Sequence, residues 1–173
     1  MWEHRLIEQM IPLIREEITR IGTHKRADLV FIDMAVDFFR TYADRTHHGK
    51  EEDILFRDLR KKQLSPEHER IMHELMEEHI VARTVVGTLV ESKEAYVGGD
   101  DRELETIIEC FTKLADLYPT HIKKEDKHFF YPALDYLTDT EQLAILDEFR
   151  EFDRNMIHEI YRTVVRDLGG KVP

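Results

Sequence analysis

The chain has 173 residues and a formal net charge of −11, with 25 Lys and Arg against 36 Asp and Glu. This balance disfavours nucleic acid and anionic membranes as partners, because both are bound through basic patches. The single cysteine excludes a disulfide framework and a cysteine-rich metal site. No apolar run approaches the roughly 20 residues of a membrane span, and the charged N-terminal segment does not resemble a signal peptide, so we expect a cytoplasmic protein. Histidine is over-represented, with 10 residues.

Apolar residues recur at three- and four-residue steps along most of the chain, which predicts amphipathic helices. We expect the first helix over residues 2–20, with Gly22 as its C-cap glycine. A second helical stretch is expected from about residue 27 to residue 61.

Local signals mark the remaining helices. Ser65 followed by Pro66 is typical of a helix start, and this third helix should end before the Gly98-Gly99 pair. A fourth helix is expected over residues 101–130, with a kink or broken turn at Pro119 because proline lacks the N–H of a helical hydrogen bond.

A capping box at Thr138-Asp139-Thr140-Glu141 predicts a fifth helix over residues 138–169. No segment reads as a strand. The expected fold class is therefore all-α: an antiparallel up-down four-helix bundle over residues 2–137 with an additional C-terminal helix. We expect residues 1–173 to form a single domain.

The histidines form an internal repeat. His4 in the first helix and His79 in the third each follow a glutamate. The partner helices carry His-x-x-x-Glu pairs, His48 with Glu52 and His121 with Glu125. Residues four apart in an α-helix project from the same face, so each pair forms a two-residue patch.

Helix lengths place these side chains at one level. His4 lies 18 residues before Gly22, and His79 lies 18 residues before Val97. On the partner helices, His48 lies 20 residues after Asp28, and His121 lies 20 residues after Asp101. At 1.5 Å per residue these distances are about 27 and 30 Å, so all the histidines should meet at the same height in an antiparallel bundle.

Four imidazoles and two carboxylates at one level suit a pair of first-row metal ions. Mixed nitrogen and oxygen ligation disfavours magnesium and calcium, and the absence of thiolates disfavours structural zinc. Iron or manganese therefore fits best, with two histidines on each ion, Glu52 and Glu125 bridging, and room for an oxo or hydroxo bridge and a small ligand.

These segments resemble the hemerythrin-like (HHE, cation-binding) proteins. The resemblance rests on Glu3-His4, His48-x-x-x-Glu52, Glu78-His79 and His121-x-x-x-Glu125, and covers about residues 2–137. It implies a four-helix bundle around a non-haem di-iron centre, with manganese or zinc as substitutes. The metal ligands implied by the resemblance are His4, His48, Glu52, His79, His121 and Glu125.

One position departs from the oxygen-carrying members of that family. They have a fifth histidine four residues before the third-helix ligand, where this chain has Leu75. The four-histidine pattern is closer to the hemerythrin-like domain of the iron–sulfur-cluster repair proteins, although those also carry an N-terminal cysteine-bearing segment. A ferritin-like site would need two Glu-x-x-His motifs, and only Glu125-x-x-His128 is present.

A second register is possible in the second helix, because His47 and Glu51 also form a His-x-x-x-Glu pair. When His48 is aligned with His121, the residues that correspond to His47 and Glu51 in the second repeat are Thr120 and Lys124, which cannot bind a metal as a pair. We therefore prefer the His48 register and expect His47 at the surface. Surface positions are also expected for His24, His68 and His73.

Three further residues have two readings each. His128 lies on the face of His121 and Glu125 and is either an additional or supporting group of the metal site, or an ordinary packing residue. Tyr118 is either a hydrogen-bond donor to the site or part of the core. Cys110 is either a redox centre or a buried, inert thiol, and its apolar neighbours favour the inert thiol.

Two function classes remain open. The first is a protein that binds or reacts with O₂, NO or peroxide at the di-iron centre, supported by an electron-donor protein. The second is non-catalytic: an O₂, NO or iron sensor, an iron store, or a repair-type iron donor. The sequence leaves open whether the protein is an enzyme.

Overall fold

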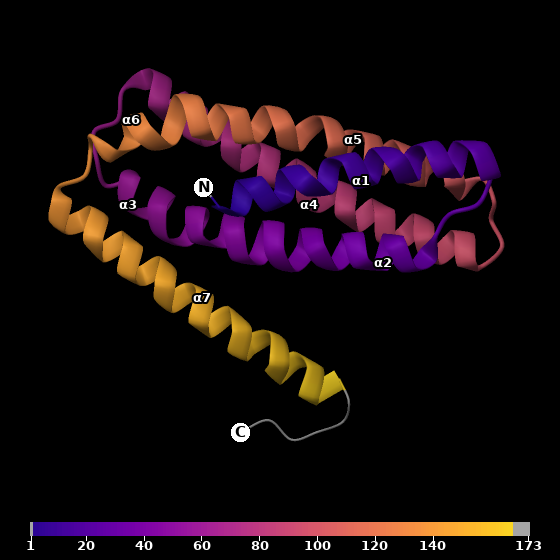
Figure 1. Cartoon of the computed structure of the whole chain (residues 1–173). Coiled ribbons are helices and arrows are strands. Elements are labelled where there is room, and N and C mark those ends of the chain that lie inside the picture. The colour runs from indigo at the N-terminus through magenta and orange to yellow at the C-terminus, as the bar shows by residue number, and fades with distance from the viewer. Residues whose placement is uncertain (1, 168–173) are drawn as a thin grey trace.

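The computed structural model describes the backbone of residues 2–167 and the side chains of residues 3–156. Within this part the chain is all-α and forms five helical rods, as expected from the sequence (Figure 1). The elements in chain order are α1 (Trp2–His24), α2 (Leu29–Asp37), η1 (Phe38–His48), η2 (Glu51–Phe56), α3 (Arg57–Leu59), α4 (Pro66–Val97), α5 (Glu103–Lys124), η3 (Glu125–Phe129), α6 (Phe130–Leu134) and α7 (Asp139–Asp167).

Several of these elements continue one another. Residues 29–59, from α2 to α3, make the second rod, and residues 103–134, from α5 to α6, make the fourth rod. The elements η1, η2 and η3 are π-helical. At the end of η1, for example, the Gly49 N–H donates to the carbonyl of Asp44, five residues back. Such segments turn the side chains by less per residue than an α-helix does, and they are frequent at functional sites.

The predicted helix starts are confirmed by their hydrogen bonds. The Ser65 hydroxyl accepts from the His68 N–H at 3.2 Å at the start of α4. At the start of α7 the Thr138 N–H donates to the Glu141 carboxylate at 2.9 Å, while the Glu141 N–H donates to the Thr138 hydroxyl at 3.3 Å. Both ends therefore follow from local side-chain capping of free backbone N–H groups.

The expected C-cap at Gly22 is wrong, because α1 continues to His24. The left-handed residue after the helix is Lys25, with φ of 53°. The reason lies in the packing of Ile21, which is 1% exposed and belongs to the apolar core, so the last turn stays helical to bury it.

The expected break at Pro119 is absent, and α5 runs unbroken from Glu103 to Lys124. Proline leaves the carbonyl four residues earlier without its helical donor. That carbonyl belongs to Ala115, and the Arg15 guanidinium of α1 donates to it at 3.1 Å. A side chain from another helix thus replaces the missing backbone bond.

The core consists of two apolar clusters that lie at different levels of the bundle. The first joins α1, α2, η1, α4 and α5, and is centred on fully buried residues such as Ile14, Leu89 and Phe111. The second joins η2, α3, α4, η3, α6 and the first turns of α7, and includes Phe56 and Phe129. Four of the rods each carry a buried histidine at the level between these two clusters.

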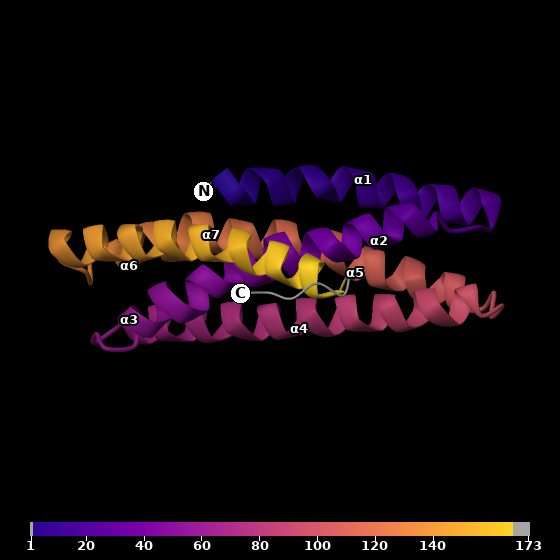
Figure 2. The ribbon, with the colours of Figure 1, turned by 90° about the horizontal axis from the view of Figure 1, so that it is seen from below.

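Helix α7 takes over the wall of the bundle that α1 does not reach. With 23 residues, α1 is about 34 Å long, whereas the 32 residues of α4 span about 48 Å. Beyond the start of α1, α7 covers the second rod and runs obliquely away from it (Figures 1 and 2). Its apolar contacts with the second cluster come from Ile145, Phe149 and Phe152.

A glycine and three ion pairs hold α7 in place. A Cβ atom built on Gly49 would lie 2.9 Å from the Phe152 ring, so the ring packs where other residues carry a side chain. The ion pairs are Lys50–Asp153 at 2.8 Å, Arg57–Glu148 at 3.0 Å and Lys62–Glu141 at 2.6 Å. Among the described residues, no helix is long and apolar enough to cross a membrane.

Candidate metal centre

Seven buried residues from four rods converge between the two apolar clusters. We call them the donor cluster: His4 of α1, His47, His48 and Glu51 of the second rod, His79 of α4, and His121 and Glu125 of the fourth rod. Their side chains are at most 1% exposed. They form overlapping groups whose potential ligand atoms lie within 4.8 Å of one another. The level arithmetic from helix length is thereby confirmed for the four rods.

The inward atoms of the donor cluster lack hydrogen bonds. Among the described residues, eleven buried side-chain nitrogen and oxygen atoms have no hydrogen-bond partner, and ten of them belong to the donor cluster. Some lie close together, such as His4 Nε2 and Glu125 Oε2 at 3.1 Å, but without the geometry of a hydrogen bond. Buried polar atoms without partners are costly and rare. A concentration of them at one point therefore fits a bound cation.

The outward nitrogen of each histidine faces a carboxylate. The Nδ1 atom of His4 lies 2.8 Å from Asp126, that of His79 2.7 Å from Glu52, and that of His121 2.8 Å from Glu78. Two longer contacts complete the set, His48 to Asp44 at 3.3 Å and His47 to Glu3 at 3.5 Å. Such carboxylates fix the ring orientation and direct Nε2 inward, as they do around metal-binding histidines.

The contacts repeat about the centre of the bundle. In Glu51-Glu52 and Glu125-Asp126 the first acid points inward and the second binds the histidine of the opposite half. The Glu3-His4 and Glu78-His79 pairs repeat in the same way, since each glutamate faces the histidine of its own partner rod. This arrangement makes His47 the structural counterpart of His121.

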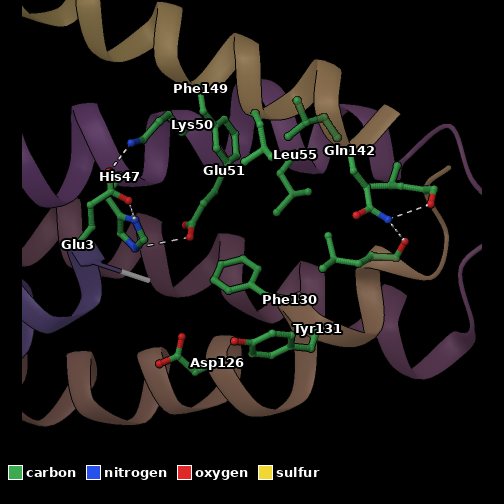
Figure 3. Close-up of a pocket in the computed structure, with 14 residues that line it drawn as sticks. Glu3, His47, Lys50, Glu51, Leu55, Asp126, Phe130, Tyr131, Gln142 and Phe149 are labelled. Carbon is green, nitrogen blue, oxygen red and sulfur yellow. Dashed lines mark hydrogen bonds and ion pairs between the residues drawn. The ribbon is translucent and has the colours of Figure 1, made fainter. Parts of the chain in front are cut away.

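The register predicted for the second rod is therefore corrected. Glu52 does not point into the centre: its side chain is 26% exposed and it binds His79 Nδ1 and Arg83, at 2.7 Å each. Glu51 takes the inward position, 3.5 Å from His47 Nε2 (Figure 3). His47 was expected at the surface and is 1% exposed. The prediction aligned His48 with His121, whereas the contacts make His47 the counterpart of His121; both His47 and His48 are buried in this π-helical rod.

The other predicted ligands lie where they were expected. His4, His79, His121 and Glu125 are all in the donor cluster, and whether they bind a metal remains a prediction. His48 is there as well, beside His79 with parallel rings and centroids 3.8 Å apart. The sequence did contain a signal for His47 in its repeated acid pairs. Aligning Glu51-Glu52 with Glu125-Asp126 places His47 opposite His121 and so predicts that His47 points inward.

Burial keeps three of the histidines neutral. It lowers the pKa of His47 and of His79, and it lowers that of His48 well below the ordinary value, with further lowering from the neighbouring imidazoles. A neutral imidazole has a free lone pair for a metal ion. These three side chains are therefore in the protonation state that metal binding requires.

The two inward carboxylates have opposite pKa shifts. Burial, followed by the nearby Glu125, raises the pKa of Glu51 well above the ordinary value. Burial opposes ionisation of Glu125 too, but contact with His121 outweighs it and lowers the pKa of Glu125. The same contact raises the pKa of His121 to about 9 against the effect of burial. A cation entering this centre would displace protons from Glu51 and His121.

The residues with two readings are placed as follows. Tyr118 is a core residue, 1% exposed and stacked on Phe39 with ring centroids 5.1 Å apart. His128 is exposed on η3 and lies outside the donor cluster. Cys110 is buried, as expected. His68 is only half-buried, and its Nδ1 lies 2.8 Å from the Tyr136 hydroxyl, whereas His24 and His73 are exposed as predicted.

Comparison with known proteins agrees with this geometry. The model of the hemerythrin HHE cation binding domain family matches residues 2–133, which include every member of the donor cluster. Comparisons with curated proteins and with solved structures found no significant match. With a buried group of histidines and glutamates able to hold a metal cation, and a family match over most of its length, this chain belongs to the hemerythrin HHE cation-binding family.

Proposed function

We propose that the donor cluster holds two iron ions and that the protein binds or reacts with O₂, NO or peroxide there. The observation that carries the proposal is the set of nine inward atoms without hydrogen bonds, all on histidine and glutamate. These residue types provide the mixed nitrogen and oxygen ligation that suits iron. Manganese and zinc are the expected substitutes.

The grouping of the donors supports two ions rather than one. One group contains His4 and His47, and the other contains His79 and His121. Glu51 and Glu125 belong to both groups. Two ions with two histidines each, sharing two carboxylates, would use all six residues, and His48 adds a further imidazole beside His79 and His121. The proposed bridging pair is therefore Glu51 and Glu125 instead of Glu52 and Glu125.

Bound iron would supply the redox chemistry, and the protein would orient the ligands and shield the centre from solvent. The carboxylates of Asp126, Glu52 and Glu78 hold the imidazoles in one orientation. The apolar clusters on either side limit the access of water to the centre. Exclusion of water strengthens electrostatic interactions within a site and limits side reactions.

The alternative is a non-catalytic protein: a sensor of O₂, NO or iron, an iron store, or an iron donor of the cluster-repair type. This non-catalytic protein would use the same metal site as the reactive one, but it would not convert its ligand in repeated cycles. Repeated reduction of peroxide or NO with an electron-donor protein would support the reactive function. A stable, reversible complex without turnover would support the non-catalytic one. A cytoplasmic location is part of both proposals.

The test compares adjacent residues of the second rod. After iron-supplemented expression, the natural protein should contain about two iron ions per chain. Glu51→Gln and His47→Ala should lose most of the iron, because each removes an inward donor. Glu52→Gln is the matched control: it alters a carboxylate one position away that contacts the outer nitrogen of His79 and Arg83 and points away from the centre. It should weaken metal affinity by about 10–100-fold, as loss of an orienting carboxylate does, and retain iron when iron is in excess. Iron loss in Glu52→Gln with full retention in Glu51→Gln would refute the assignment, and absence of iron from the natural protein would refute the proposed function.

A further inference from the structure

A cavity of about 310 Å³ lies between α7 and the bundle, next to the donor cluster. Its deep end is lined by His47 and Glu51, each 1% exposed. Its mouth is formed by Tyr131, Leu134 and Leu146, which are 40 to 76% exposed. The cavity thus leads from solvent to the inward carboxylate of the second rod.

The size of the cavity exceeds what a diatomic ligand needs. A dry apolar cavity of about 150 Å³ is enough for benzene, and small-molecule sites in proteins begin near 300 Å³. This cavity has room for a molecule of about two fused rings. A passage for O₂ or NO alone would not require this volume.

The walls are apolar along the length of the cavity. They carry Leu55 of η2, Phe130 of α6, and Leu137, Ile145 and Phe149 from the loop and from α7 (Figure 3). Apolar walls favour an apolar body through its removal from water. The residues after 133 contribute a large part of this lining, and they lie outside the part of the chain that the family model matches.

Polar groups occur mainly at the deep end, and their charges select against anions. The carboxylates of Glu3 and Asp126 line the cavity there. The one lysine in the lining, Lys50, is engaged by Glu3 and by Asp153. Glu51 offers two oxygens without hydrogen bonds, buried and directed toward His47 at this end (Figure 3).

We propose that this cavity binds a neutral small organic molecule with an apolar body of about two rings and one hydrogen-bonding group. The body lies among Leu55, Phe130 and Ile145, and in the metal-free chain the polar group reaches Glu51 and His47. Helix α7 is then a wall of the binding site, and it determines which molecules reach the donor cluster. Only the approach of the molecule to a metal rests on the proposed function, since the walls exist without a cation.

The test uses 2-naphthol, a neutral two-ring alcohol, with the full-length metal-free chain. Calorimetry should show one molecule bound per chain, and methyl NMR should show shifts at Leu55 and Ile145. Naphthalene, which lacks the hydroxyl, and 2-naphthoate, which is anionic, should each bind at least about tenfold more weakly. Equal affinity for naphthalene would refute the placement of the polar group, and equal affinity for 2-naphthoate would refute the selection against anions.

Matched variants of α7 locate the site. Leu146→Trp enlarges a partly exposed side chain of the lining and should weaken 2-naphthol binding at least about tenfold. Leu143→Trp makes the same change at an exposed position of α7 outside the lining and should leave binding unchanged. Leu134→Trp repeats the test from the opposite wall should Leu146→Trp lower the melting temperature. Unchanged binding in both lining variants, or no binding to the natural chain, would overturn the inference.

Iron content measured on the same preparations keeps the two proposals apart. Binding of 2-naphthol to a chain that takes up no iron would leave the cavity assignment standing and refute the di-iron function. An iron-loaded chain that does not bind 2-naphthol, in either the loaded or the metal-free form, would do the reverse.

Discussion

The contact between Gly49 and Phe152 predicts that a single methyl group will loosen α7 without unfolding the bundle. Gly49 lies between the inward residues His48 and Glu51 of the second rod, and Phe152 lies against it from α7. In Gly49→Ala the new Cβ would lie 2.9 Å from the ring, closer than real Cβ contacts allow. The ring is the end of a movable side chain, so we expect it to move, and α7 with it.

Two opposing contributions determine how much Gly49→Ala changes the free energy of unfolding. Replacing glycine by alanine within a helix stabilises it by about 1 kcal/mol. Full burial of a phenylalanine contributes roughly 1.5–3 kcal/mol, and Phe152 is half-buried, so displacing it costs about 1 kcal/mol. The net change in the free energy of unfolding should therefore be close to zero. The second rod should become more stable, whereas the packing of α7 on it should become weaker.

The assay measures global and local stability together. The melting temperature of Gly49→Ala should stay within about 2 °C of the natural protein, while amide hydrogen exchange in residues 145–156 should accelerate. Gly87→Ala is the control, because nothing lies within 4 Å of a Cβ built there. It should raise the melting temperature by about 2–4 °C and leave exchange in α7 unchanged. Identical behaviour of the two variants would refute the argument that Gly49 seats α7.

Three further predictions concern the centre and its support. Asp126→Asn should weaken metal affinity by about 10–100-fold, measured by chelator competition, because it removes the carboxylate that orients His4. The melting temperature of the metal-free protein should fall between pH 6.5 and about 9: the folded-state pKa of His121 is raised, so its stabilising charge is complete below pH 6.5 and is lost as the pH rises. Leu75→Ala should cost about 2–5 kcal/mol in urea unfolding, because Leu75 is fully buried in the second cluster.

Each of these predictions has a contradicting outcome. Asp116→Asn alters an exposed carboxylate of α5 and serves as the control for Asp126→Asn, and equal affinities in the two variants would argue against an orienting role. Glu125→Gln should reduce the pH dependence, because it removes the carboxylate that contributes most to the raised pKa of His121, and an unchanged curve would assign that dependence elsewhere. A cost below about 1 kcal/mol for Leu75→Ala would mean that the second cluster collapses around the deletion.

Much of the architecture follows from the sequence because it depends on local rules. The three- and four-residue spacing of apolar residues determines the rods, and the caps at Ser65 and Thr138 determine where two of them start. Helix rise is constant, so residue counts alone placed His4, His79 and His121 at one level. The composition likewise excluded thiolate sites before any contact was known.

The tertiary structure decided what local rules leave open. The choice between Glu51 and Glu52 depends on the rotation of the second rod about its axis, because each of them follows a histidine four residues earlier. The carbonyl that Pro119 leaves without a helical donor accepts a hydrogen bond from Arg15, more than 100 positions away in sequence. The cavity exists only because α7 returns along the second rod. Contacts between distant segments of the chain therefore determined which side chains face the centre and what space lies beside it.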